Sequence, residues 1–264
     1  MDATQGEPAT VVTTADRRRQ VSVTAAEVFC ILGTLVGLGV LGTAVEDSSE
    51  GALAADATLL APAGPAFSIW SLVYVGLAAY TIWQWLPGPA ASPRTRATGW
   101  LAALSMVLNA AWLLVTQQGW IWTSVAVIVA LAATLLELVR RLTSRRPSGL
   151  LERVVVDATF GVYLGWVLVA VCANVAAALE DGGRTVGELF AVIVLSLVAG
   201  VGILVAELYG GRLSIALASA WGLLWIAAGR LLDAPESAVT GVAALAAAAI
   251  TVGAAVRARL GREL

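Results

Sequence analysis

The sequence predicts an all-α protein that crosses a membrane eight times. Of its 264 residues, 59% are hydrophobic and only 13% are charged, whereas a soluble domain is about half apolar and a quarter charged. Apolar runs of about 20 residues recur along almost the whole chain, and a helix of that length spans the hydrocarbon core of a bilayer. The alternation of apolar and polar residues that is typical of membrane strands is absent.

Eight spans follow from the positions of these runs and of the breaks between them. They are expected at residues 24–45, 66–86, 98–117, 120–141, 154–179, 187–208, 212–232 and 238–257. The segments 87–94 and 144–149 are rich in Pro, Gly, Ser and Arg and indicate turns. The short segment "QQGW" (117–120) is also read as a turn, because one helix over 98–141 would be about 66 Å long, twice the membrane thickness.

The arginines support both the number of spans and the orientation. All 16 basic residues are Arg. Fourteen of them lie in the N- and C-terminal segments and in every second loop, and the remaining two, Arg184 and Arg230, lie among acidic residues in the alternate loops. Because loops rich in Arg stay in the cytoplasm, we expect a multi-pass protein of the inner (plasma) membrane with both termini in the cytoplasm.

The chain divides into three parts. Residues 1–20 are polar and are expected to form a disordered tail. Residues 21–180 hold five spans, and residues 181–264 hold three spans that are richer in Ala, Val and Gly. The loop 46–65 is the longest between spans, and it is expected on the side of the membrane opposite the termini.

Composition excludes several kinds of site. The chain has no His, which removes the commonest metal ligand and general base, so no metal site is expected. The two cysteines lie inside apolar runs and indicate no disulfide framework. Five acids are read as lying near span ends, at the interface with water: Glu27, Glu137, Asp157, Glu188 and Glu207. A transporter would need a deep acid for ion coupling, and on this interpretation none is present.

Aromatic and amide side chains inside three spans form the candidate binding site. The residues are Trp70 and Tyr74 in the second span, Asn109 and Trp112 in the third, and Tyr163, Trp166, Ala170 and Asn174 in the fifth. Within each span their spacing places them on one helix face. Indole and amide groups need partners in hydrocarbon, so these faces are expected to turn inward. Two interpretations stay open: hydrogen bonds between helices, or a shared pocket for a flat, largely apolar ligand.

The same residues carry a resemblance to a known family. The segments "PAGPAFSIWSLVY" (62–74), "LNAAW" (108–112) and "VYLGWVLVAVCAN" (162–174) resemble, in order and spacing, motifs of the translocator protein family, also called the tryptophan-rich sensory protein (TspO/MBR) family. Val162 stands where the family has Pro. The resemblance covers residues 24–179 and implies a TspO-like five-helix bundle with three further helices.

Function is inferred from this resemblance. It implies a receptor-like or sensory membrane protein, often a homodimer, that binds a porphyrin, haem or sterol-like ligand at the eight residues named above. No covalently attached cofactor and no nucleic-acid partner is expected; the partners are a small lipophilic ligand and the lipid bilayer. A small-molecule transporter is the main alternative. A porphyrin-modifying enzyme is a lesser one, because the chain offers few groups for acid–base chemistry.

Overall fold

The fold is a bundle of long helices, as predicted. The structure, a computed structural model, describes residues 11–37, 39–41 and 51–262, and within these ranges it contains helices and no strand. Eight helical segments there are long and apolar enough to cross a membrane. The prediction of an all-α polytopic membrane protein with eight spans is therefore confirmed.

The helix boundaries agree with the expected spans for all but the first. The helices are α1 (Thr14–Gly37), α2 (Ile69–Trp83), α3 (Pro87–Ala90), α4 (Pro93–Thr116), α5 (Ile121–Thr143), α6 (Leu150–Glu152), α7 (Thr159–Asp181), α8 (Glu188–Tyr209), α9 (Leu213–Leu232) and α10 (Ala238–Leu260). A 3₁₀ turn, η2 (Gly64–Ser68), leads into α2, and a π-helical segment, η3 (Arg153–Ala158), joins α6 to α7. The expected turn between α4 and α5 contains Gly119 at a φ of 70°, a conformation that glycine adopts readily.

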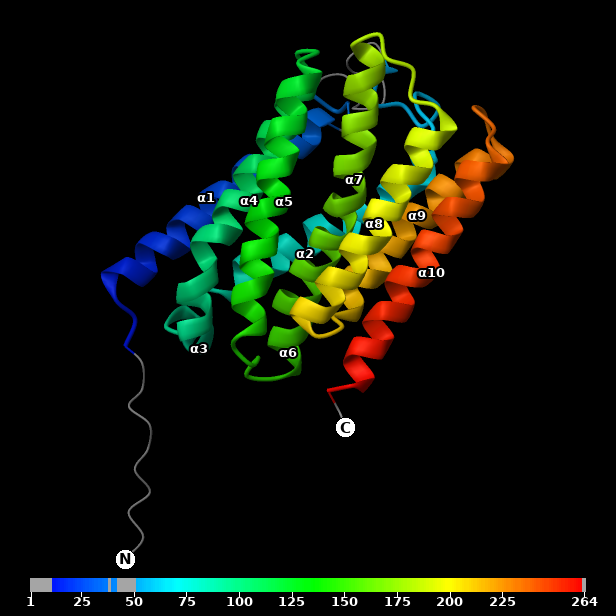
Figure 1. The fold of residues 1–264 in the computed structure, drawn as a ribbon. Coiled ribbons are helices and arrows are strands. Elements are labelled where there is room, and N and C mark those ends of the chain that lie inside the picture. Colours follow the sequence, from blue (N-terminus) through cyan, green and yellow to red (C-terminus); the bar gives the residue numbers. More distant parts are fainter. Residues whose placement is uncertain (1–10, 38, 42–50, 263–264) are drawn as a thin grey trace, which may run out of the picture.

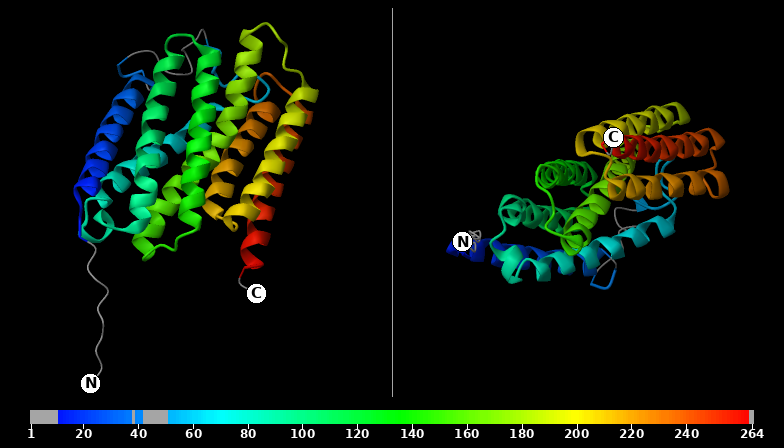
Figure 2. Two further views of the ribbon diagram at one scale, coloured as in Figure 1. Left: turned by 60° about the vertical axis from the view of Figure 1, so that its left-hand side comes forward. Right: turned by 90° about the horizontal axis from the view of Figure 1, so that it is seen from below.

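The long helices pack in a continuous series with α7 near the centre (Figure 1). α1 packs on α4, α4 on α5, α5 on α7, α7 on α9, α9 on α10 and α10 on α8. Seen from below, α8, α9 and α10 form a group beside α7, and α1 and α4 lie on its other side (Figure 2). α1 begins and α10 ends at the same end of the bundle.

Glycines allow the closest helix contacts. A Cβ atom at Gly33 of α1 would lie 2.9 Å from the Cβ of Ala110, so the absence of a side chain at Gly33 allows α1 to pack closely on α4. On α7, a Cβ at Gly161 or Gly165 would collide with Ser214 or with the main chain of Ile215 on α9. The backbones of α7 and α9 are therefore in contact along one side.

The buried apolar residues form two main clusters. One lies mainly among α1, α2, α4, α5 and α7, includes Leu77, Met106 and Phe160, and extends to buried residues of α8 and α9. The other lies mainly among α8, α9 and α10 and includes Leu60 and Val169. The core of the first five spans therefore continues into the last three.

The prediction for α1 was wrong in position. The helix begins at Thr14 rather than at residue 24, so residues 14–20 are helical and not part of a disordered tail; residues 1–10 and 42–50 lie outside the described residues. Thr13 and Asp16 form a reciprocal cap, in which the Asp16 main-chain N–H donates to Thr13 Oγ1 and the Thr13 N–H donates to Asp16 Oδ2. Such a cap fixes a helix N-terminus.

Polar residues in the first turns of α1 are buried because the neighbouring helices supply partners. Arg19 pairs with Asp16 at 2.7 Å and donates to the carbonyl oxygen of Ala90. Gln20 and Gln84 each donate from the side-chain amide to the other's main-chain carbonyl. The polar side chains that suggested a disordered tail thus have hydrogen-bond partners inside the protein.

The shift of α1 also changes the position of Glu27. This residue is 13 positions after the start of the helix and 10 before its end, or about 15 Å from the nearer end. It is 4% exposed, it makes no ion pair with a described residue, and its Oε2 atom has no hydrogen-bond partner. Glu27 is therefore a buried acid, seven residues after the polar segment 14–20 with which α1 begins, and its assignment to the interface stays a prediction.

An ion cluster connects α4 with the π-helical segment and with α9. Arg94 contacts Glu152 at 2.9 Å and Asp157 at 2.6 Å, and Arg212 contacts Asp157 at 2.5 Å. The two acids are five positions apart. The wider turn of a π-helix, in which each N–H bonds five residues back, favours their shared approach to Arg94. Asp157, which we expected near the interface as a single charge, is thus part of a buried network.

We expect Arg94→Met to lower the free energy of unfolding by about 3–5 kcal/mol, because it leaves two buried carboxylates without their common partner. Equilibrium unfolding of the detergent-solubilised protein measures this effect. Arg140→Met is the matched control, since the Arg140 side chain is 64% exposed and exposed pairs contribute little. Equal stability of the Arg94 variant and the wild type would contradict a structural role for the cluster.

Candidate functional site

The site begins with an aromatic cluster between α2 and α7. Trp70 stacks on Tyr74, with ring centroids 5.5 Å apart and an interplanar angle of 15°. The Trp70 ring also meets the edges of Tyr163 at 5.9 Å and Trp166 at 6.1 Å. Phe67, in the 3₁₀ turn before α2, contacts Trp166 at 5.8 Å. The predicted faces of the second and fifth spans therefore do turn toward each other.

Five of the eight predicted residues border a small cavity, named here the aromatic cavity. They are Trp70, Trp112, Trp166, Ala170 and Asn174, and Phe67 completes the aromatic wall. The remaining side is formed by residues 52–62 of the loop between α1 and η2. The volume of the cavity is about 50 Å³, far below the roughly 300–1,000 Å³ of sites for small molecules.

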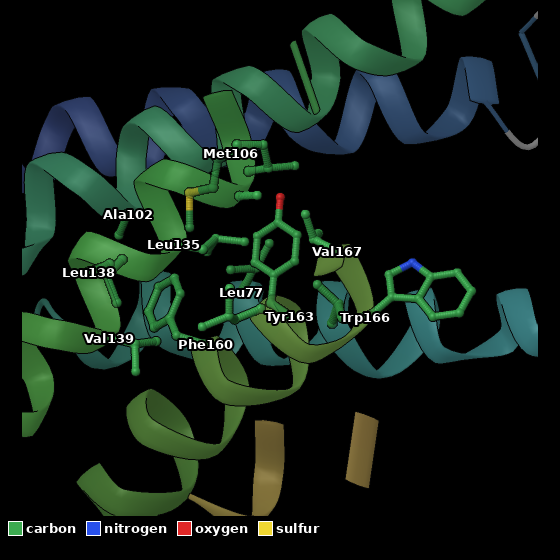
Figure 3. Close-up of a cluster of buried hydrophobic side chains, with 14 of the residues drawn as sticks. Leu77, Ala102, Met106, Leu135, Leu138, Val139, Phe160, Tyr163, Trp166 and Val167 are labelled. Carbon is green, nitrogen blue, oxygen red and sulfur yellow. The ribbon is translucent and has the colours of Figure 1, made fainter. Parts of the chain in front are cut away.

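The other three predicted residues pack beside the cavity and do not line it. The Asn109 amide nitrogen donates to the Tyr74 hydroxyl at 3.3 Å and to Cys30 Sγ at 3.4 Å. Tyr163 is buried and donates to the main-chain carbonyl of Ser105. In Figure 3 its ring points toward Met106, whereas the Trp166 indole extends away from that cluster.

Hydrogen bonds hold α4, α5 and α7 together at the cavity wall. Trp112 Nε1 donates to Asn174 Oδ1 at 2.8 Å, and Asn174 Nδ2 donates to Ser124 Oγ at 3.0 Å. Trp112 and Asn174 therefore join helices, as one interpretation of the sequence predicts, and they also border the cavity. Sequence reasoning missed Ser124, because a lone serine near a span end has no distinctive pattern.

One polar group at the cavity is buried and has no partner. Trp166 is 1% exposed and its Nε1 atom makes no hydrogen bond with a described residue. A buried N–H without a partner is costly, so an acceptor atom on a bound molecule would be stabilised there. Among the described residues, no group of three or more acidic or cysteine side chains is placed to hold a metal ion.

The loop that closes the cavity is held by α9. Residues 51–63 are named here the covering loop, which lies at the end of the bundle opposite the start of α1 (Figure 1). Arg230, 1% exposed, donates to the carbonyl oxygens of Thr58 at 2.9 Å and Ala55 at 3.0 Å. The Ala63 N–H donates to the carbonyl of Trp225.

Two residues of α9 bind the first part of the chain. Arg230 binds the covering loop through the carbonyls of Thr58 and Ala55. Trp221 Nε1 donates to the Ala66 carbonyl in η2, at 2.9 Å. The three-helix part of the chain therefore supplies contacts that close the aromatic cavity.

Comparison with known proteins gives one match. A family model described as "TSPO-like protein" matches residues 23–256, from within α1 to near the end of α10. The match includes α8, α9 and α10 as well as the first five spans. No curated protein and no solved structure matches the chain.

We expect Arg230→Met to increase hydrogen–deuterium exchange of amides in residues 51–63 by about tenfold or more, because hydrogen bonds from a charged donor contribute about 1.5–3 kcal/mol each. Mass spectrometry of the detergent-solubilised protein resolves exchange in this segment. Asp233→Asn is the control, since it changes a charge on the same helix end without touching these bonds. Unchanged exchange in the Arg230 variant would show that the loop is held by other contacts.

Proposed function

Since the chain belongs to the TSPO-like family, we propose that it is a receptor-like or sensory membrane protein that binds a flat, largely apolar ligand in the aromatic cavity. The ligand class is a porphyrin-like or sterol-like molecule. The observation that supports this proposal most directly is the buried, unpartnered N–H of Trp166 at a cavity walled by Phe67, Trp70 and Trp112. Flat apolar walls with a single free donor suit a ring system with an acceptor at its edge.

Binding of such a ligand requires the covering loop to move. Sites for small molecules have volumes of roughly 300–1,000 Å³, and the aromatic cavity has about 50 Å³. The loop is the side of the cavity that is not part of a packed helix. The ligand would therefore displace residues 52–62 and break the contacts of Arg230 with Thr58 and Ala55.

This coupling provides a route for a signal. Because the covering loop is bonded to α9, its displacement changes the contacts of α9, which packs on α7 and α10. A ligand stabilises whichever state binds it more tightly. The proposed sensory output is thus a change in the three-helix part of the chain when the cavity fills.

The proposed orientation places the cavity away from the cytoplasm. Arg94 and Arg212, which share Asp157, lie where α4 and α9 begin, at the same end of the bundle as the start of α1, and the covering loop lies at the other end. Arg-rich ends are retained in the cytoplasm, so the loop would face the outer side of the inner membrane. A ligand would reach the cavity from that side or from the outer leaflet.

A small-molecule transporter is the second candidate, and Glu27 supports it. Acids buried within membrane spans are commonly part of proton relays and ion pathways. Glu27 is three positions from Cys30, which accepts a hydrogen bond from Asn109, and Asn109 also bonds Tyr74. Tyr74 in turn stacks on Trp70 at the cavity. The contacts that begin at the wall of the proposed ligand site therefore reach Cys30, one helical turn from the buried acid.

Protoporphyrin IX is expected to bind the detergent-solubilised protein saturably, measured from the change in the porphyrin absorption band. Trp166→Phe keeps the aromatic wall and removes the N–H, and we expect it to weaken binding by about twofold to tenfold, the value of one neutral hydrogen bond. Trp120→Phe is the control, because Trp120 is 59% exposed and does not line the cavity. Absence of saturable binding would remove porphyrins from the ligand class, and equal binding by both variants would place the ligand elsewhere.

The transporter hypothesis predicts that protoporphyrin IX enters proteoliposomes faster when a pH gradient is imposed. Glu27→Gln, which keeps the shape but cannot ionise, is expected to remove this dependence on the gradient while leaving binding intact. Glu137→Gln serves as the control, because Glu137 is paired with Arg140 and Arg141 at the end of α5. Uptake no faster than in protein-free liposomes would reject the transporter, and gradient-driven uptake by the Glu27 variant would reject the role of this acid.

A further inference from the structure

An open, basic pocket lies between α4 and α5, at the end of the bundle where α1 begins (Figure 1). Its volume is about 320 Å³, within the range of small-molecule sites, roughly 300–1,000 Å³. It is lined by Ala97 of α4, by Arg140 and Arg141 in the last turn of α5, and by Ser144 and Arg145 just after that helix. We call it the arginine pocket. It shares no lining residue with the aromatic cavity.

The arginine pocket carries a net positive charge. Its lining includes three arginines, and the carboxylate beside them is that of Glu137, which pairs with Arg140 at 2.6 Å and with Arg141 at 2.7 Å. Three positive charges and one negative charge leave a net charge of +2. Because a concave surface lined by one sign of charge attracts the opposite sign, the pocket favours an anion.

Each of these arginines keeps N–H groups that no described residue uses. Arg140 bonds Glu137 through Nε and Nη2, so its Nη1 has no described partner. Arg141 bonds Glu137 through Nε and a main-chain carbonyl of α4 through Nη1, which leaves Nη2 unused within the described chain. Arg145 makes one long side-chain bond, at 3.4 Å, from Nη1 to Ser144 Oγ. Guanidinium groups with unused N–H groups suit phosphate, whose oxygens accept paired hydrogen bonds from Arg.

The rest of the fold holds the arginines in position. The Arg145 main-chain carbonyl accepts a bond from Arg94 Nε at 3.1 Å, and the Leu142 carbonyl accepts one from Arg94 Nη2 at 3.3 Å. The buried ion cluster therefore fixes the end of α5. The Arg141 guanidinium group is bonded on both sides, to α5 and to α4. Side chains that are held in position before binding lose less conformational entropy when a ligand binds.

The exposed face of α4 places the pocket at the level of the lipid headgroups. Trp100 follows Ala97 by three residues and is 55% exposed, and exposed Trp side chains near the ends of membrane helices lie at the headgroup level. Leu104 and Val107 continue this face away from the start of α4 and are 45% and 39% exposed. Residues at this spacing share one side of a helix. A molecule with its anionic group in the pocket can therefore lay acyl chains along α4.

We propose that the arginine pocket binds the phosphate group of an anionic phospholipid, with the acyl chains along the Trp100 face of α4. The unused N–H groups of the three arginines donate to the phosphate oxygens. Basic pockets between membrane helices on the cytoplasmic side are typical sites for anionic headgroups, and the proposed orientation of the chain places this end of the bundle there. A soluble phosphate has the same headgroup chemistry but makes no contact with the apolar face. The site is independent of the ligand proposed for the aromatic cavity.

The test measures lipid binding to the full-length, detergent-solubilised protein by native mass spectrometry, as the bound fraction against lipid concentration. Phosphatidic acid is compared with phosphatidylcholine of identical acyl chains. We expect phosphatidic acid to bind about tenfold more tightly, because each Arg near the membrane surface attracts an anionic headgroup. Glycerol 3-phosphate carries the phosphate without the chains, and at the same concentration it is expected not to displace the lipid.

Single Arg→Gln variants locate the site. Arg141→Gln and Arg145→Gln are each expected to weaken binding of phosphatidic acid by about fivefold to tenfold. Arg146→Gln is the matched control, because Arg146 is in the same loop, is exposed and does not line the pocket; we expect it to weaken binding less than twofold. The Arg145 side chain is exposed, so Arg145→Gln is expected to keep the melting temperature of the lipid-free protein.

Three outcomes overturn the proposal. Phosphatidic acid that binds no better than phosphatidylcholine would show that the pocket does not select an anionic headgroup. Equal weakening by Arg145→Gln and Arg146→Gln would assign binding to the general surface charge. Displacement of the lipid by an equal concentration of glycerol 3-phosphate would assign the pocket to a soluble phosphate.

Discussion

Polar groups that these helices carry into the membrane need partners inside the protein, because hydrocarbon supplies none. Arg94 shows how strongly this constraint acts, since it meets Glu152, Asp157 and two main-chain carbonyls within one buried cluster. Arg212 of α9 joins the same cluster through Asp157. The requirement to pair charges therefore connects the first five spans with the last three at one end of the bundle.

The same constraint operates at the opposite end, where it closes the aromatic cavity. The guanidinium group of Arg230 is satisfied by carbonyls of the covering loop, and those carbonyls are satisfied by Arg230. When the loop opens, the guanidinium group and the carbonyl oxygens each need water or another hydrogen-bond partner. On the proposed function, ligand binding, loop position and the state of α9 would be parts of a single equilibrium, and this coupling would be the physical basis for a sensory role.

The eight spans and the inward orientation of the aromatic faces were predictable from sequence, because apolar run length and helical spacing depend on local residues. The start of α1 was not predicted, although the Thr13–Asp16 cap is visible in the sequence, because the partners of Arg19 and Gln20 lie 64 to 71 residues away. The burial of Glu27 was not predicted for the same reason. Tertiary packing determines the roles of Ser124 and Arg230 and the volume of the cavity. No sequence pattern indicates any of them.

The contact between α7 and α9 has a consequence for how such chains diversify. Gly161 and Gly165 leave no space for a side chain against Ser214, Ile215 and Ala218. A larger residue on either helix requires a compensating reduction on the other, so these positions can vary only in concert. A hybrid that takes its last three helices from a divergent homologue would lose the close contact between α7 and α9, unless the contacting residues of both helices were exchanged together.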